Sequence, residues 1–334
     1  GYNTIGISAN GMISPFTKMD TGFNIFIDIT EKDETLKEAT AYGRTKFQII
    51  MNLMKKGKFK ELYSFYKASK YRIKLSSNYP VDKGGNWITW LMGRVSLETP
   101  FFVFINFMEM HDPYPSDVKY PTNQFHLNDL FGIKKINESL MNRIRKEYFE
   151  QSKVADLYFK RILDVIKNVY DNTLIILTSD HGQALKEKNF YGHGLYLYDE
   201  LVKIPMIIKY PKGQKPKEKA SLSLTNIYDF IKMATEGIYE LKKEEFIISE
   251  AYGIKDNIEG IAVDEATRKL YDVPRKAVFK DGYKLVVNGS TGEIEEFTYK
   301  GKPLDKKDKS IEDLLNYLYI YKGNEKFVLP SAVV

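Results

Sequence analysis

The most distinctive chemical feature of the chain is a carboxylate next to an imidazole. His181 follows Asp180 in the segment Ser179-Asp180-His181-Gly182, directly after the apolar run TLIILT at 173–178. A carboxylate oxygen and an imidazole nitrogen can both bind a divalent metal ion, and adjacent residues can share one ion where the backbone turns sharply, as glycine allows. Two ligands do not complete a site, so further carboxylates are required. The alternative is that Asp180 caps a following helix and His181 has no chemical role.

Two further histidines are candidates for acid–base chemistry. His111 precedes Asp-Pro-Tyr-Pro at 112–115, and the prolines stiffen the loop that would hold the imidazole in place. A fixed imidazole suits proton donation to a leaving oxygen or hydrogen bonding to an anionic substrate. The alternative is a loop histidine that bonds a carbonyl. His193 lies between Gly192 and Gly194, and backbone freedom of this kind is typical of binding loops.

The elements around these residues predict an α/β fold. FFVFINF at 101–107 and TLIILT at 173–178 are typical of strands buried on both faces, and apolar residues at helical spacing predict a long helix over 138–169. A further strand is expected at 203–210 and a helix at 224–234. This alternation favours a mostly parallel central sheet flanked by helices, with ligands beyond the carboxyl ends of its strands. If the first two strands are parallel, both histidine segments reach one edge of the sheet.

The pattern changes along the chain. The remaining elements of the first part are strands at 3–10 and 23–29 and helices at 33–75 and 82–100. From about residue 236 the chain has short strands joined by Asp-Gly and Asn-Gly turns, closed by a helix at 310–321. We therefore predict an α/β domain at 1–235 and a small C-terminal antiparallel α+β subdomain at 236–334.

Composition excludes several classes of site and partner. The chain has no cysteine, which excludes disulfides, thiolate metal sites and a cysteine nucleophile. The net charge of +6 is spread thinly, so no nucleic-acid partner is expected. The longest apolar run, at 101–108, is far shorter than the roughly 18 residues that cross a bilayer. No signal segment opens the chain, so we expect a cytoplasmic protein without a membrane segment; its oligomeric state is left open.

The order of these motifs resembles the sulfatase family of the alkaline phosphatase superfamily. FFVFINFMEMHDPY (101–114), a long helix, NTLIILTSDHGQ (172–183) and GHGLYLYDELVKIPMII (192–208) follow the family's succession of strand, His-x-Pro-Tyr, helix, strand, Ser-Asp-His-Gly-Glu and Gly-His-Gly loop. The segments at 1–26 and 277–288 resemble the family's Gly-Tyr-x-Thr strand and its C-terminal hairpin. The resemblance covers most of the chain and implies an alkaline phosphatase-like fold.

The resemblance also implies roles for the site residues. Asp180 and His181 would bind one divalent metal ion, which is calcium or magnesium in the family's sulfatases. An imidazole ligand also suits manganese or zinc. His111 and His193 would contact the sulfate, or another oxyanion, and assist departure of the leaving group. The function implied is metal-dependent hydrolysis of a sulfate ester, with a small anionic ester as substrate.

The chain departs from the family pattern at several positions. Gln183 stands where the family usually has Glu, and Asp199 and Glu200 are expected to be structural. The chain has neither a cysteine nor a Ser-x-Pro-x-Arg motif, which carry the family's nucleophile. Gly1 matches a family position beyond the first strand and the nucleophile, so we expect both to be missing and this chain to be inactive without them.

Two other functions fit parts of the sequence. A phosphodiesterase, a phosphonate hydrolase or a phosphoethanolamine transferase of the same superfamily would use the same site with a different nucleophile. A catalytically inactive sulfatase-like binding protein would explain the missing nucleophile. The three imidazole segments argue against an inactive protein, because a binding scaffold has no physical need for them.

Overall fold

The computed structural model describes residues 1–29, 51, 54–55, 82–112, 114, 125–214, 222–254 and 264–321. The helix predicted at 33–75 lies outside these residues except for positions 51, 54 and 55. The chain forms two compact units. Unit 1 comprises residues 1–123 and 138–168, and unit 2 comprises residues 124–137 and 169–334.

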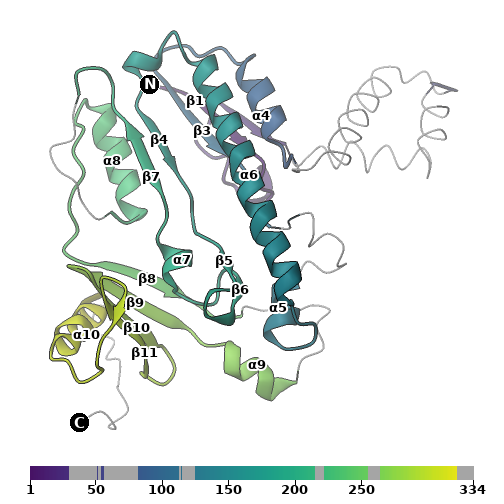
Figure 1. Ribbon diagram of the computed structural model, residues 1–334. Coiled ribbons are helices and arrows are strands. Elements are labelled where there is room, and N and C mark those ends of the chain that lie inside the picture. Colours follow the sequence, from purple (N-terminus) through teal and green to yellow (C-terminus); the bar gives the residue numbers. More distant parts are fainter. Residues whose placement is uncertain are drawn as a thin grey trace. The chain divides into compact units, whose positions relative to one another are not determined.

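Unit 1 is built on a parallel three-stranded sheet (Figure 1). Its strands are β1 (Asn3–Ser8), β2 (Ile25–Asp28) and β3 (Phe101–Asn106), in the order β2-β1-β3. The 3-10 turn η1 (Pro15–Thr17) follows β1. Burial of apolar side chains against helices stabilises this layer, because Ile5 and Ile7 of β1 share a core with α4 (Gly85–Met92) and α6 (Glu138–Val165).

The helix predicted over 82–100 is shorter in the structure. It ends at Met92, and Gly93 takes the C-cap. Val95 and Leu97 then pack against the core from a non-helical segment. Tertiary packing therefore overrides the local helical pattern after Met92.

The first half of unit 2 contains two small antiparallel sheets. Strand β4 (Ile175–Thr178) pairs with β7 (Met206–Lys209), and β5 (Ala184–Leu185) pairs with β6 (Tyr191–Gly192). The helices here are α5 (Phe125–Leu130), α7 (Asp199–Val202) and α8 (Thr225–Thr235), with 3-10 turns η3 (Tyr170–Asn172) and η4 (Glu187–Asn189). The connection from β4 to β7 carries both the β5–β6 hairpin and α7, and it returns the chain antiparallel.

The second half of unit 2 is a five-stranded antiparallel sheet, hereafter the C-terminal sheet, in the order β12-β11-β10-β9-β8. Its strands are β8 (Ile247–Ala251), β9 (Arg275–Lys280), β10 (Tyr283–Asn288), β11 (Ile294–Tyr299) and β12 (Lys302–Pro303). α9 (Glu265–Tyr271) precedes β9, and α10 (Ser310–Tyr321) lies against the sheet (Figure 1). Its residues Ile311, Leu314 and Leu318 are buried in the core that it forms with the sheet.

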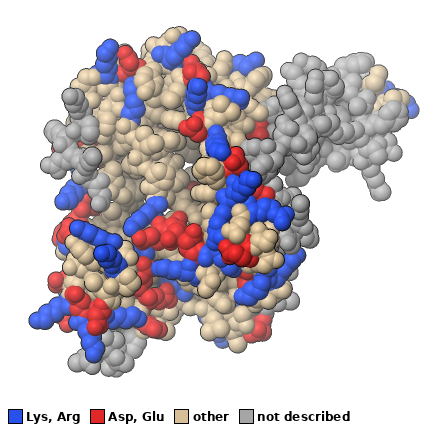
Figure 2. Space-filling view, viewed as in Figure 1, with Lys and Arg blue, Asp and Glu red and all other residues tan. Residues whose placement is uncertain are grey.

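The predicted fold class is confirmed: a parallel sheet with helices is followed by an antiparallel sheet closed by a helix. The strands β3 and β4 are half-buried rather than buried on both faces. No helix within the described ranges combines the length and the apolar character needed to cross a membrane. Basic and acidic side chains are interspersed on the face shown in Figure 2, as expected from the thinly spread charge.

Candidate active site

His181 and His193 lie side by side in unit 2. His181 follows the end of β4, and His193 directly follows β6. Their rings are stacked, with centroids 4.2 Å apart and an angle of 24° between the planes. The fold therefore brings together two imidazoles that are twelve positions apart in the sequence.

Gly182 fixes the backbone next to His181. Its N–H donates to the carbonyl of Leu201 over 2.8 Å. A Cβ at this position would lie 2.0 Å from the carbonyl oxygen of Glu200, closer than real contacts allow. Glycine is required here because the backbone of α7 passes against it. The next regular element after Asp180 is the strand β5, so this segment gives no support to the helix-capping interpretation of Asp180.

Asp180 and His181 present a donor set that fits a divalent metal ion. His181 Nδ1 donates to the carbonyl of Gly182 over 2.8 Å, which makes Nε2 the nitrogen with the lone pair. Metal-binding histidines commonly donate their other N–H to a backbone carbonyl in this way. Asp180 Oδ2 lies 3.9 Å from that Nε2, a separation that two ligands of one ion can have when each bond is about 2.0–2.6 Å long.

His193 is oriented by the side chain of Gln183, the residue that stands where the family usually has Glu. Its Nδ1 lies 2.8 Å from Gln183 Oε1, an acceptor, so Nδ1 carries a hydrogen. Gln183 Nε2 is buried and has no hydrogen-bond partner among the described residues. Gly192 and Gly194 have φ values of 114° and 94°, in the region that favours glycine, so the backbone on both sides of His193 depends on them.

His111 lies in unit 1, in the loop after β3. Its Nδ1 is 2.8 Å from Asp112 Oδ1 and 2.5 Å from the carbonyl of the same residue, so Nδ1 carries a hydrogen. The hydrogen bond to the Asp112 side chain raises the pKa of His111, against a smaller opposing effect of burial. Lys83 Nζ donates to the carbonyl of His111, and the buried Tyr114 donates to the carbonyl of Met110 over 2.6 Å. Asp112 is thus an orienting carboxylate that sequence reasoning did not single out.

Glu109 is a buried carboxylate that sequence reasoning also missed. It is 0% exposed, and its Oε1 accepts from the backbone N–H groups of Gly85 (2.8 Å) and Lys83 (3.2 Å) at the start of α4. Burial raises the pKa of Glu109, and Asp82 adds to the shift, while the backbone hydrogen bonds oppose it. Glu109 Oε2 is buried without a hydrogen-bond partner among the described residues. The available signal in the sequence was an acidic residue within the otherwise apolar segment 107–110, which follows β3.

Comparison with known proteins decides the family. The sulfatase family model matches residues 1–235. The chain belongs to the sulfatase family. The motifs that contain Asp180, His181 and His193 therefore lie within the region that matches the family.

The relatives of this sulfatase-family chain are distant. It is 21% identical over 228 residues to an uncharacterised sulfatase of Escherichia coli, which covers 60% of this chain and 45% of that protein. It is 26% identical over 238 residues to a sulfatase of Formosa agariphila, covering 55% of this chain and 46% of the relative. The chain thus spans less than half the length of either relative.

A solved structure supports the fold. The phosphonate monoester hydrolase of Silicibacter pomeroyi matches with a TM-score of 0.53 and 13% sequence identity, covering 96% of this chain and 77% of that one. At this level of identity the likeness bears on the fold alone.

Proposed function

We propose that this sulfatase-family chain carries the metal-binding and anion-binding residues of a hydrolase of sulfate esters, with a small anionic ester as substrate. The observation that supports the proposal most strongly is the stacked His181–His193 pair beside Asp180. A carboxylate and two imidazoles within one small region are suited to binding a cation and an anion together.

Asp180 and His181 would hold one divalent metal ion. Calcium or magnesium is expected from the family, and the imidazole ligand also suits manganese or zinc. When bound, a divalent ion in such a site neutralises charge on the oxygens of the ester. Two ligands from this chain leave the site incomplete, so further carboxylates must contribute.

His193 and His111 would act on the ester itself. With Nδ1–H bonded to Gln183, His193 would contact an oxyanion through Nε2 in the imidazolium form. His111, whose raised pKa favours the imidazolium, would donate its proton to the departing alkoxide. We propose that His111 of unit 1 acts at the same substrate as the pair in unit 2.

We propose that these 334 residues do not supply the nucleophile of the reaction. They contain no cysteine and no Ser-x-Pro-x-Arg motif. We therefore propose that the chain hydrolyses sulfate esters only in a polypeptide that also carries the nucleophile. We also propose that the chain is divided into an α/β domain at 1–235 and a C-terminal antiparallel subdomain at 236–334.

The second candidate is a phosphonate or phosphodiester hydrolase. Its support is the phosphonate monoester hydrolase among the structural neighbours, which shares the fold over 96% of this chain. Sulfate and phosphonate monoesters present similar oxyanions, and the same imidazoles would contact either. The two functions differ in the ester that is turned over rather than in the residues of this chain.

An activity comparison tests the proposal. We would assay a polypeptide that includes the nucleophile against 4-nitrophenyl sulfate and 4-nitrophenyl phenylphosphonate, with and without added divalent metal, beside its Asp180→Ala variant. We expect metal-dependent release of nitrophenol from the sulfate, lost in the variant. Preferential turnover of the phosphonate would favour the second candidate. Turnover of neither ester would favour an inactive binding protein.

A further inference from the structure

The segment at 195–199 joins His193 to α7 and contacts the C-terminal sheet at Leu195, Leu197 and Asp199. Leu197 packs in one buried cluster with Ala251, Ala277 and Val286 of that sheet. At the far end, Asp199 Oδ1 accepts from Lys284 Nζ over 2.8 Å. The sheet that lies farthest along the sequence is therefore in direct contact with the loop that carries His193.

Arg275, the first residue of β9, holds the start of this segment. Its side chain is only 6% exposed, and Nη1 donates to the carbonyls of Leu195 (3.1 Å) and Val273 (3.0 Å). Its Nε donates to Glu295 Oε2 over 2.6 Å. A buried guanidinium with a carboxylate and two carbonyl partners is a fixed group, because losing any partner would leave buried charge or polarity unsatisfied.

The guanidinium also begins a stack of charged and aromatic groups. Arg275 Cζ lies 4.4 Å from the ring centre of Tyr196, and that ring is parallel to Tyr198 within 6° at 4.7 Å. At the Tyr198 end of the stack, Lys188 Nζ lies 4.5 Å from the centre of the Tyr198 ring. The same Nζ pairs with Glu296 Oε2 over 2.8 Å. Cations attract aromatic faces, so each end of the tyrosine pair is closed by a positive charge.

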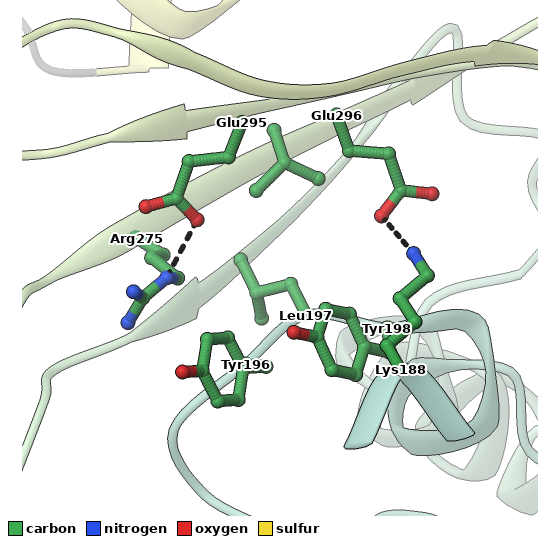
Figure 3. Close-up of a pocket in the computed structure, with 8 residues that line it drawn as sticks. Lys188, Tyr196, Leu197, Tyr198, Arg275, Glu295 and Glu296 are labelled. Carbon is green, nitrogen blue, oxygen red and sulfur yellow. Dashed lines mark hydrogen bonds and ion pairs between the residues drawn. The ribbon is translucent and has the colours of Figure 1, made fainter. Parts of the chain in front are cut away.

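A β-bulge in β11 allows the neighbouring carboxylates of Glu295 and Glu296 to pair with Arg275 and Lys188, respectively. The register with β10 shifts so that Val286 pairs with Glu296 and Val287 pairs with Ile294, which leaves Glu295 as the extra residue. Successive side chains of a regular strand point to opposite faces, but a bulge redirects one of them. Figure 3 shows Glu295 and Glu296 together on one side of the pocket, with the two tyrosines across from them.

We propose that Arg275 is a second positioning residue for His193 beside Gln183, and that through it the C-terminal sheet fixes the backbone that carries the imidazole. His193 is flanked by glycines with positive φ, and glycine restricts its own backbone least, so contacts from other elements must fix this loop. The bond from Arg275 to the Leu195 carbonyl lies two residues beyond His193 and restrains the loop there. The catalytic meaning of this inference rests on the proposed function; the positioning itself does not.

Two structural measurements on the 334-residue chain test the inference without any substrate. We expect Arg275→Met to raise amide hydrogen exchange in peptides covering 190–199 by about tenfold or more, while peptides from β10 keep their wild-type rates. The ring-current shift of the His193 Hε1 proton, caused by stacking on His181, should also decrease. Arg275→Lys keeps the charge but has one nitrogen in place of three, so we expect an intermediate change in both measurements.

Lys280→Met is the matched control. Lys280 ends the same strand, pairs with Glu245 over 3.1 Å and lies over the ring of Tyr317 at 4.8 Å, so it has the same kinds of partner but no contact with the 195–199 segment. We expect this variant to leave the exchange of 190–199 and the His193 shift unchanged. Equal changes in the Lys280 and Arg275 variants would show a general loss of sheet stability and overturn the inference. Unchanged exchange and an unchanged His193 shift in both Arg275 variants would overturn it as well.

An activity measurement separates this inference from the proposed function. In a polypeptide that turns over 4-nitrophenyl sulfate, Arg275→Met should lower kcat about 10- to 100-fold, since small misplacements of a reacting group cost about that much. Arg275→Lys should recover part of the loss. If the parent polypeptide turns over no ester, the proposed function fails, and the exchange and NMR results still decide the role of Arg275.

Discussion

The substitution Gly182→Ala tests how tightly the His181 backbone is fixed. In the structure a Cβ at residue 182 would lie 2.0 Å from the carbonyl oxygen of Glu200, whereas ordinary contacts begin at 3.4 Å. The two segments must therefore separate by about 1.4 Å. The obstacle is backbone of α7, which cannot rotate away as a side chain can.

The size of the effect follows from that displacement. Forcing an extra carbon into a packed site typically costs about 1–3 kcal/mol of stability, and a backbone clash falls at the upper end of that range. A shift of about 1 Å in a group that binds or reacts can reduce turnover about 100-fold. We therefore expect Gly182→Ala, in a polypeptide that completes the metal site, to weaken divalent metal binding strongly and to lower the free energy of unfolding by about 2–3 kcal/mol.

Gly93→Ala is the matched control for this substitution. Gly93 has a φ of −70°, and a Cβ there would lie 3.6 Å from the nearest atom, an ordinary contact. We expect denaturant unfolding and calorimetric titration with Mn²⁺ to show little change in this variant. If Gly182→Ala bound metal and unfolded like the Gly93 variant, the close packing of α7 against the His181 segment would be refuted.

Three further outcomes are expected. In a polypeptide that completes the metal site, Asp180→Ala should abolish binding of Mn²⁺ in a calorimetric titration, and retained affinity would remove Asp180 as a ligand. Asp112→Asn should lower the pKa of His111 in an NMR titration, because it removes the carboxylate that raises it; an unchanged titration would refute that cause. The raised pKa of Glu109 means that its contribution to stability is present at low pH and is lost as the pH rises from 4.5 through the folded-state pKa. In urea unfolding, Glu109→Gln should therefore raise the free energy of unfolding at pH 8 relative to the parent and leave it unchanged at pH 4. An increase of equal size at both pH values would contradict the raised pKa of Glu109.

Local pattern was sufficient for much of the fold. The long helix predicted at 138–169 is observed as α6 (Glu138–Val165), and the final helix predicted at 310–321 is observed with the same bounds. Both have apolar residues at regular helical spacing and buried faces. The helix predicted over 82–100 was too long, because Val95 and Leu97 enter the core without helical geometry.

The groups that orient the candidate site were harder to predict. Gln183 and Asp112 contact histidines through local geometry that residue type alone does not specify. The contact of Arg275 with Leu195 joins residues 80 positions apart and depends on strand pairing within the C-terminal sheet. Short-range motifs therefore indicated the chemistry, whereas the residues that position it followed from tertiary structure.

The proposal that His111 acts at the same site as His181 and His193 can be tested directly by metal-dependent NMR. The chain has four histidines, so selective labelling gives a simple spectrum, with His126 as the fourth signal. Substoichiometric Mn²⁺ should broaden the signals of His111, His181 and His193 together in a polypeptide that completes the metal site, and Asp180→Ala should abolish the broadening of all three. A His111 signal that stays sharp while that of His181 broadens would contradict the account.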